Sequence, residues 1–170
     1  LLSAAALAPG RAQAQVVVTI NGDEARADIN LPGPGGPYLA EVRLRFRNPV
    51  NLSAACLGIS AVVLDTGGIA ALNARLPDAA LAVDPAFPMV VTVEPPSACG
   101  LAFSGDYEFE FRAINLVWAP GSPYRLYKAP IGTSFHDITA SVVAGSVRAR
   151  GASGSFSEFV VVVDSAPDYT

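Results

Sequence analysis

Apolar and polar side chains alternate along the stretch YLAEVRLRFR, residues 38–47. Val42, Leu44 and Phe46 fall on one face of this stretch. Glu41 and three arginines fall on the other face. A period of two is typical of a strand that is buried on one face only, so the stretch predicts one strand of an antiparallel sheet.

A second stretch, DYEFEFR at residues 106–112, alternates in the same way. Its aromatic face consists of Tyr107, Phe109 and Phe111, and its other face carries Asp106, Glu108 and Glu110. The acidic face is opposite in charge to the arginine face of residues 38–47, which favours the two strands as antiparallel neighbours. Because an exposed cross-strand pair contributes only ~0.2–1 kcal/mol, the charges indicate the register and add little stability.

The two cysteines of the chain support the same pairing. Cys56 follows the first strand closely, and Cys99 shortly precedes the second. In an antiparallel pair the end of one strand lies beside the start of the other, so both thiols fall at the same edge. We therefore expect a Cys56–Cys99 disulfide if the chain reaches an oxidising compartment, with two buried thiols as the alternative.

The rest of the chain also predicts short strands separated by turn residues. Asn21-Gly22 between two such segments is typical of a tight hairpin. Helix is expected only at 69–77, with 79–83 as a second option. This pattern favours an all-β fold, an antiparallel immunoglobulin-like β-sandwich of about 8–10 strands, with a barrel as the alternative. The further strands are expected at 15–21, 25–31, 57–64, 88–94, 124–128, 138–143, 146–150 and 156–164.

Length and composition fit a single packed domain. The chain has 170 residues, of which 51% are hydrophobic and 15% charged, so it has enough apolar material for one core. The formal net charge of −4 disfavours binding to nucleic acid, whose phosphates attract basic proteins. No stretch beyond the N-terminal run has the roughly 18–20 apolar residues of a transmembrane helix, so no integral membrane segment is expected.

The N-terminus predicts a signal peptide remnant at 1–14. A short apolar run, interrupted at Pro9-Gly10-Arg11, precedes an A-x-A pattern that ends at Ala14. We expect cleavage after Ala14 and a single domain at 15–170 that is periplasmic or secreted, with a frayed N-terminal helix as the alternative. Ten of the eleven basic residues are arginine, which together with abundant Ala, Gly and Pro indicates a bacterial source.

Residues able to carry catalysis are few. His136 is the only histidine of the chain, so a serine–histidine triad or a histidine-rich zinc site would have to form around it. Its neighbour Asp137 is expected on the opposite face of a strand. We expect no catalytic residue, no metal and no cofactor. The enzyme alternative is a secreted hydrolase that uses His136 or two carboxylates of the strand containing Glu108.

Three aromatic residues gather around the turn at 120–123. Trp118, Tyr124 and Tyr127 are suited to stack on a sugar or to contact a peptide if their rings are exposed. They are the candidate ligand contacts. The alternative is that Trp118 fills the core at the end of the strand containing Tyr107.

Several short motifs together resemble a known group of proteins. They are VTING at 18–22, INLP at 29–32, VEPP at 93–96, YRLY at 124–127, FHDIT at 135–139 and FSEF at 156–159. The group consists of uncharacterised exported bacterial proteins of unknown function, and the resemblance implies an exported single domain without assigning a site. Ser155-Phe156-Ser157 also resembles the end of ZU5-type domains, where a His-Phe-Ser triplet allows self-cleavage. Ser155 replaces the histidine here, so the expected base is missing.

The sequence as a whole favours a non-catalytic exported module with a binding or structural role. Its partner would be an unidentified protein or glycan at the cell surface. The alternatives are a carbohydrate-binding module that uses exposed aromatic rings and a secreted hydrolase.

Overall fold

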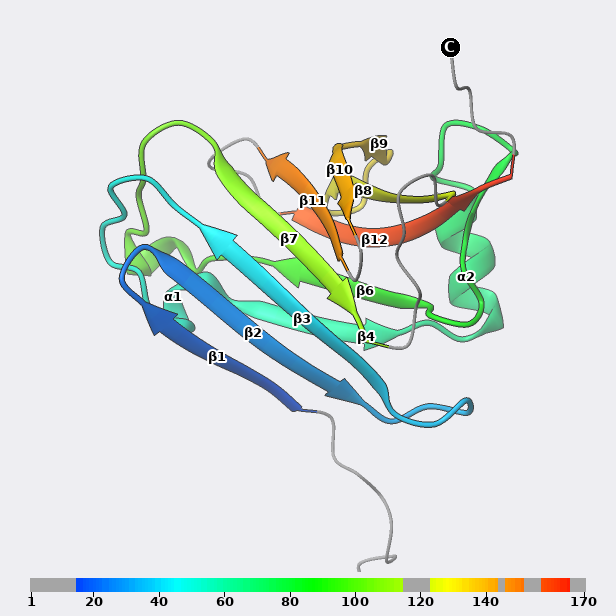
Figure 1. Ribbon diagram of the computed structural model, residues 1–170, viewed down its shortest axis with the longest axis horizontal. Coiled ribbons are helices and arrows are strands. Elements are labelled where there is room, and N and C mark those ends of the chain that lie inside the picture. Colours follow the sequence, from blue (N-terminus) through cyan, green and yellow to red (C-terminus); the bar gives the residue numbers. More distant parts are fainter. Residues whose placement is uncertain (1–14, 115–122, 144–145, 152–156, 166–170) are drawn as a thin grey trace, which may run out of the picture.

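The protein consists of two antiparallel sheets packed face to face (Figure 1). The structure, a computed structural model, describes residues 15–114, 123–143, 146–151 and 157–165. The expected all-β sandwich is confirmed, whereas its immunoglobulin-like topology remains a prediction. Among the described residues, no helix has the length and apolar character that a membrane span requires.

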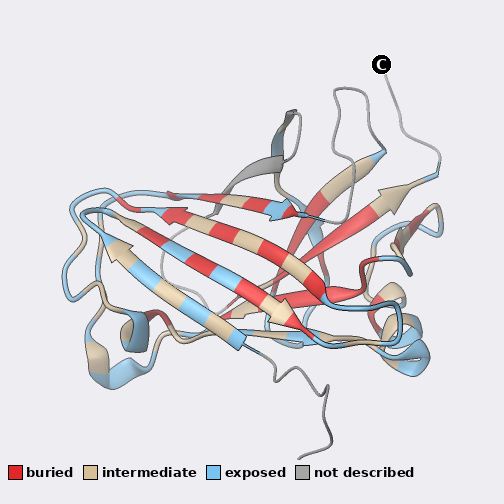
Figure 2. Ribbon diagram, turned by 60° about the horizontal axis from the view of Figure 1, so that its bottom comes forward, coloured by how far each residue is buried: buried red, intermediate tan, exposed pale blue. Residues whose placement is uncertain are grey.

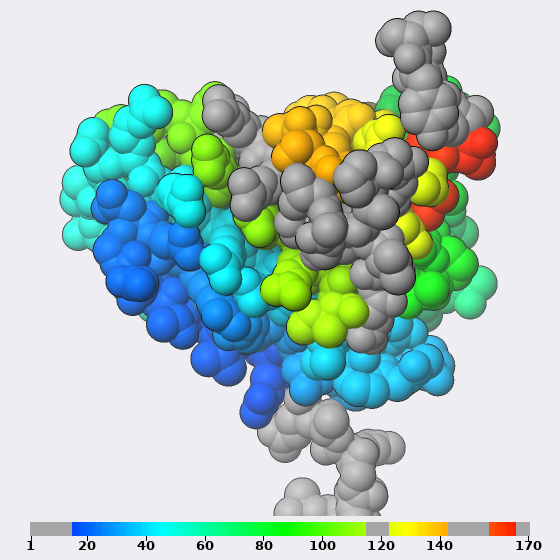
Figure 3. All heavy atoms as spheres, in the orientation of Figure 1, coloured from blue at the N-terminus to red at the C-terminus, as the bar shows by residue number. Residues whose placement is uncertain are grey.

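The first sheet has the strand order β1-β2-β3-β7-β11-β10. Its strands are β1 (Gln15–Asn21), β2 (Glu24–Leu31), β3 (Tyr38–Arg45), β7 (Tyr107–Ala113), β10 (Thr139–Val143) and β11 (Ser146–Gly151). The expected hairpin joins β1 to β2, with Asn21 paired to Glu24 across the turn. Gly22 has φ +61°, a left-handed conformation that glycine adopts without steric cost. Residues of β1, β2 and β3 cover the lower left of the molecule in Figure 3.

The central pair of the first sheet is β3 and β7, as the two alternating stretches predict. Their antiparallel register places Arg43 opposite Glu110 and Arg45 opposite Glu108. Arg45 Nη1 lies 3.8 Å from a carboxylate oxygen of Glu108, and both side chains are more than half exposed. The opposite charges of the two stretches therefore predicted correctly that β3 and β7 are neighbours, although an exposed ion pair of this kind is weak. Figure 2 shows the alternation as bands of buried and less buried residues along β2 and β3.

The second sheet has the order β4-β6-β12-β8-β9, and β5 pairs with β12 beside this path. Its strands are β4 (Ile59–Val63), β5 (Leu81–Val83), β6 (Met89–Val93), β8 (Tyr124–Pro130), β9 (His136–Asp137) and β12 (Ser157–Asp164). Strand β12 is buried on both faces: Phe159 belongs to the core between the sheets, whereas Val160 belongs to a second cluster on the other side. This double burial explains the continuous apolar run FVVVV at 159–163, which does not alternate.

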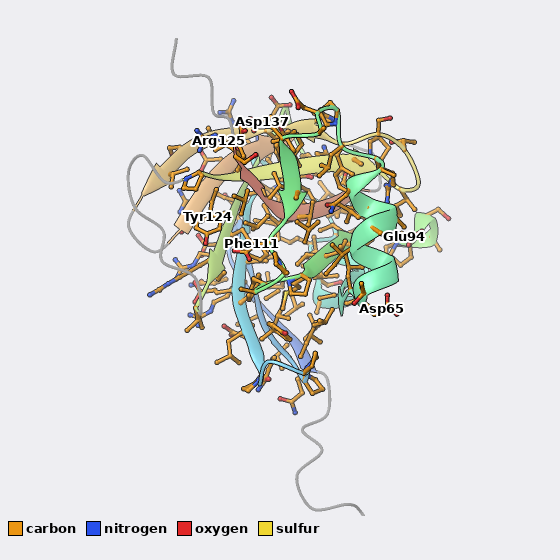
Figure 4. All side chains as sticks on the ribbon, turned by 90° about the vertical axis from the view of Figure 1, so that its right-hand side faces the viewer. Asp65, Glu94, Phe111, Tyr124, Arg125 and Asp137 are labelled. Atoms are coloured by element: carbon orange, nitrogen blue, oxygen red, sulfur yellow. A yellow bond between two sulfur atoms is a disulfide. The ribbon has the colours of Figure 1, made fainter. Side chains whose placement is uncertain are left out.

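Two apolar clusters hold the layers together. The larger cluster fills the space between the sheets, where Phe109 of β7 stacks on Phe159 of β12 with ring centroids 3.9 Å apart. Phe111, labelled in Figure 4, belongs to the same cluster. The smaller cluster lies on the far side of the second sheet and includes Leu72 of helix α2 (Thr66–Asn73). The second sheet is thus the middle layer of this part of the molecule.

Three of the expected segments differ in the structure. Residues 57–64 do not form one strand, because helix α1 (Ala54–Leu57) occupies the start of the segment and β4 begins only at Ile59. The side chain of Ser53 caps α1 by accepting a hydrogen bond from the amide of Cys56, and Gly58 ends the helix in a left-handed conformation.

The other two differences concern the helix predicted at 69–77 and the option at 79–83. The helix α2 begins earlier, at Thr66, because Asp65 caps it by accepting a hydrogen bond from the amide of Gly68 (Figure 4). The option at 79–83 is wrong, because β5 pairs its residues Leu81 to Val83 with β12. That pairing buries Leu81 and Val83 in the smaller apolar cluster.

Candidate functional site

A disulfide between Cys56 and Cys99 closes one end of the sandwich, as the cysteine positions predict. The two Cα atoms are 5.4 Å apart. Cys56 belongs to α1, and Cys99 ends a 3₁₀ turn, η1 (Ser97–Cys99). The bridge therefore ties the segment that follows β3 to the segment that precedes β7, at the α1 end of the molecule in Figure 1.

A cavity of about 220 Å³ lies beside this disulfide. It is partly open to solvent, and its walls come from both sheets and from the two bridged segments. Most of the lining is apolar. The lining residues are Leu44, Phe46, Leu57, Val93, Pro95, Pro96, Ser97, Gly100, Leu101, Phe103 and Tyr107.

Three aromatic rings form one wall of the cavity. The ring centroids of Phe46 and Phe103 are 4.9 Å apart, and that of Tyr107 lies 5.6 Å from Phe46 and 5.8 Å from Phe103. Phe46 and Tyr107 are buried, whereas Phe103 is half-buried. Because each ring packs against the other two in tilted or edge-on geometry, the three rings hold one another in place.

Two backbone segments that contribute Leu57, Val93 and Pro95 to the lining approach each other closely. The amide of Glu94 donates a hydrogen bond of 3.2 Å to the carbonyl oxygen of Gly58. A Cβ atom at Gly58 would overlap the carbonyl oxygen of Glu94, so only glycine allows this contact. The contact places the fully buried Leu57 beside the residues that follow β6.

A cluster of three buried polar side chains, those of Tyr107, Ser157 and Lys128, lies next to the aromatic wall. A hydrogen bond joins the hydroxyl groups of Tyr107 and Ser157, and Ser157 is fully buried. Lys128 is only 4% exposed, and its ammonium nitrogen lies 5.7 Å from the ring centroid of Tyr107 and 6.0 Å from that of Phe159. Both distances allow a cation–π interaction.

Burial is the main cause of the pKa shifts of Tyr107 and Lys128. It raises the pKa of Tyr107 above its ordinary value, so the phenol is protonated at neutral pH. Burial lowers the pKa of Lys128, and the negative charge of Asp106 partly opposes this effect.

The aromatic residues predicted as ligand contacts do not form one surface. Tyr127 is only 7% exposed and packs in the smaller apolar cluster, so its ring does not meet the condition of exposure on which the predicted ligand contact depends. Tyr124 is half-buried and packs against the larger cluster, on the opposite face of β8 (Figure 4). The two residues are three positions apart, and an odd spacing along a strand directs side chains to opposite faces. Trp118 lies outside the described residues.

His136 and Asp137, considered above for catalysis, together form the short strand β9. His136 is exposed on the short strand β9. Its neighbour Asp137 accepts a hydrogen bond from the amide of Thr139 and so shapes the local turn. Within the described parts of the chain, no three His, Cys, Asp or Glu side chains lie close enough together to hold a metal ion. Ser155 and Phe156, two residues of the triplet that resembles the end of ZU5-type domains, lie outside the described residues.

The cavity was not found from the sequence, because its residues come from several segments that only the fold brings together. One signal was available: Leu57 directly follows Cys56, and Leu101 lies two residues after Cys99. Apolar residues next to both bridged cysteines indicate that the disulfide covers an apolar space. The chain also contains a single lysine, Lys128, and the structure places it buried beside the lining residue Tyr107.

Comparison with known proteins gives a family but no characterised relative. A comparison with the curated proteins finds no match, and neither does one with the solved structures. The sequence model of one family matches residues 1–170, and this family is described as a family of unknown function. The chain therefore belongs to the family DUF6689.

Proposed function

We propose that this protein is an exported, non-catalytic binding module whose site is the cavity beside the Cys56–Cys99 disulfide. The ligand is a compact apolar molecule, or one with a compact apolar group, of about the size of a substituted benzene. The cavity volume of about 220 Å³ carries this proposal. An apolar protein cavity of ~150 Å³ stays dry and binds benzene, so a cavity of this size has room for a slightly larger ring.

The lining supports an apolar ligand. Ligand sites in proteins are mostly lined by apolar and aromatic side chains, with few polar groups. Phe46, Phe103 and Tyr107 provide aromatic surface, and Leu57 and Leu101 provide aliphatic surface. Because the rings pack on one another, their mutual contacts hold the wall in position, and less affinity is lost to ordering these side chains on binding.

Export from a bacterial cell is part of the proposal. The disulfide supports it, because such bonds form and persist in oxidising compartments such as the periplasm. The short apolar run and the A-x-A pattern before Gln15 support it as well.

Toluene is the test ligand, because it is apolar and close to benzene in size. Titrating the full chain with toluene should shift the methyl NMR signals of Leu57, Leu101 and Val93 in a saturable way. The variant Leu101→Phe should weaken toluene binding at least tenfold, because the larger side chain fills part of the cavity.

Leu39→Phe is the matched control, since Leu39 is half-buried on β3 but does not line the cavity. This variant should bind toluene as the parent protein does. Absence of saturable shifts at the three lining residues, or equal binding by both variants and the parent, would overturn the proposal.

A further inference from the structure

The buried ammonium group of Lys128 lies next to the ring of Tyr107, which lines the cavity. Lys128 of β8 is almost completely buried, and its ammonium nitrogen lies 5.7 Å from the ring centroid of Tyr107. Tyr107 in turn lines the cavity. The amine itself is not part of the cavity lining, so its influence on a ligand acts through space.

The described lining contributes no charged side chain of its own, so the nearby charges set the electrical potential in the cavity. Asp106 acts on Lys128 from the turn before β7, but its side chain is exposed. Glu94 lies between lining residues in the chain and is also exposed. Water and salt screen exposed charges much more than buried ones, so the ammonium group acts on the cavity more strongly than either of these two carboxylates.

We infer that Lys128 is a specificity-determining residue that makes the cavity prefer anionic over cationic ligands of the same shape, so that among charged aromatic molecules it takes acids. This inference rests on the proposed function, because it concerns the same cavity. Transfer from water into the cavity penalises both a carboxylate and an amidinium, and each ligand pays the same hydration cost in the parent protein and in a variant. A change in the preference between ligands of the same shape on substitution therefore reports the sign of the potential that the replaced side chain creates.

Benzoate, benzamide and benzamidine test the inference, because they share one ring and a planar substituent but are anionic, neutral and cationic at pH 7. Their dissociation constants for the full chain are measured from the methyl NMR signals of Leu57 and Leu101. Benzoate should bind at least about tenfold more tightly than benzamidine, as expected for a partly screened positive charge near the cavity. Neutral benzamide, which pays no cost for transfer of a charge, measures the binding of the ring and its planar substituent alone.

The variant Lys128→Met should reduce the ratio between benzoate and benzamidine to less than about twofold. Methionine has a similar length and suits a buried position, and apolar replacement of a buried ion is often tolerated. Arg45→Met is the matched control: it removes a positive charge from the end of β3, where the side chain is 65% exposed, and should leave the ratio unchanged.

Asp106→Asn provides a second variant if Lys128→Met does not fold. Asp106 lies close enough to Lys128 to raise the pKa of the amine. Removing this exposed negative charge should increase the preference for benzoate, because the carboxylate offsets part of the positive potential of Lys128 in the cavity. Benzamidine binding as tightly as benzoate to the parent protein would overturn the inference, and so would a ratio that survives Lys128→Met. If toluene binds but the charged ligands do not differ, the inference alone fails; if none of the ligands binds, the proposed function fails too.

Discussion

Arg75 and Glu158 form a two-point ion pair on the outer side of the second sheet. The two guanidinium nitrogens of Arg75 donate hydrogen bonds of 3.2 and 2.8 Å to the two carboxylate oxygens of Glu158. The amide of Gly132 donates a further hydrogen bond of 2.9 Å to the same carboxylate. The Glu158 side chain is only 15% exposed, so this contact contributes more stability than the exposed pairs between β3 and β7.

The pH dependence of stability should reflect this ion pair. Burial alone raises the pKa of Glu158, but the hydrogen bonds from Arg75 and Gly132 and the charge of Arg75 outweigh it and lower the pKa below the ordinary value of 4.5. A carboxyl group whose pKa is lowered by folding stabilises the folded state above its unfolded pKa. This stabilisation is lost as the pH falls through the lower, folded pKa.

The variant Glu158→Gln should therefore be less stable than the parent protein by about 1–3 kcal/mol at pH 6–7. The difference should shrink as the pH falls below 4.5. Urea unfolding of both proteins between about pH 2 and pH 7 measures it. A difference that is constant across this range, or that grows in acid, would show that the charge of Glu158 does not stabilise the fold.

Substitution of Gly58 tests the close contact between the backbone segments beside the cavity. Its φ of +59° and the nearby carbonyl oxygen of Glu94 both oppose a Cβ atom. Gly22 is a matched control, because it has φ +61° but no atom within 4 Å of a Cβ. Gly22→Ala should cost about 1–2 kcal/mol, the usual penalty for this backbone conformation. Gly58→Ala should cost clearly more, and equal losses in chemical unfolding would refute the close approach.

At the scale of elements, the two bridged segments α1 and η1 depend on each other. Neither is long, since α1 has four residues and η1 has three, so neither is stable as an isolated helix. The disulfide joins them over a sequence separation of 43 residues. Loop closure of this length removes conformational entropy from the unfolded chain.

Replacing both cysteines by serine should lower the free energy of unfolding by about 2–4 kcal/mol. Thermal and urea unfolding of the double variant against the oxidised parent measure the loss. The parent should show no titratable thiol under denaturing conditions until a reductant is added. Two thiols that titrate in protein purified without a reductant would contradict the bridge.

Elements could be predicted from sequence where local pattern and tertiary environment agree. The pair β3 and β7 was predictable, because alternation, complementary charge and the cysteine positions all indicate the same neighbours. Helix α1 was missed, because an apolar segment is equally compatible with a strand and the decisive signals are single residues, Ser53 and Gly58. Strand β5 was missed because its strand conformation comes from pairing with the distant β12.

At the scale of the whole molecule, the cavity forms only when distant segments of the chain come together in the fold. Its walls combine the end of β3, the start of β7, the residues after β6 and both bridged segments. No single stretch of sequence contains this arrangement, which is why the sequence indicated aromatic residues around 120–123 as the candidate site instead. The ring of Tyr127 proved to be a core side chain, whereas the rings that line a cavity belong to Phe46, Phe103 and Tyr107.

The most direct test of the central claim, a preformed apolar cavity beside the disulfide, is a crystal structure of the full chain under xenon pressure. Xenon enters apolar protein cavities without needing polar contacts. An anomalous difference peak bounded by Phe46, Leu57 and Phe103 is expected. A well-diffracting xenon-treated crystal without a peak at this position would contradict the claim.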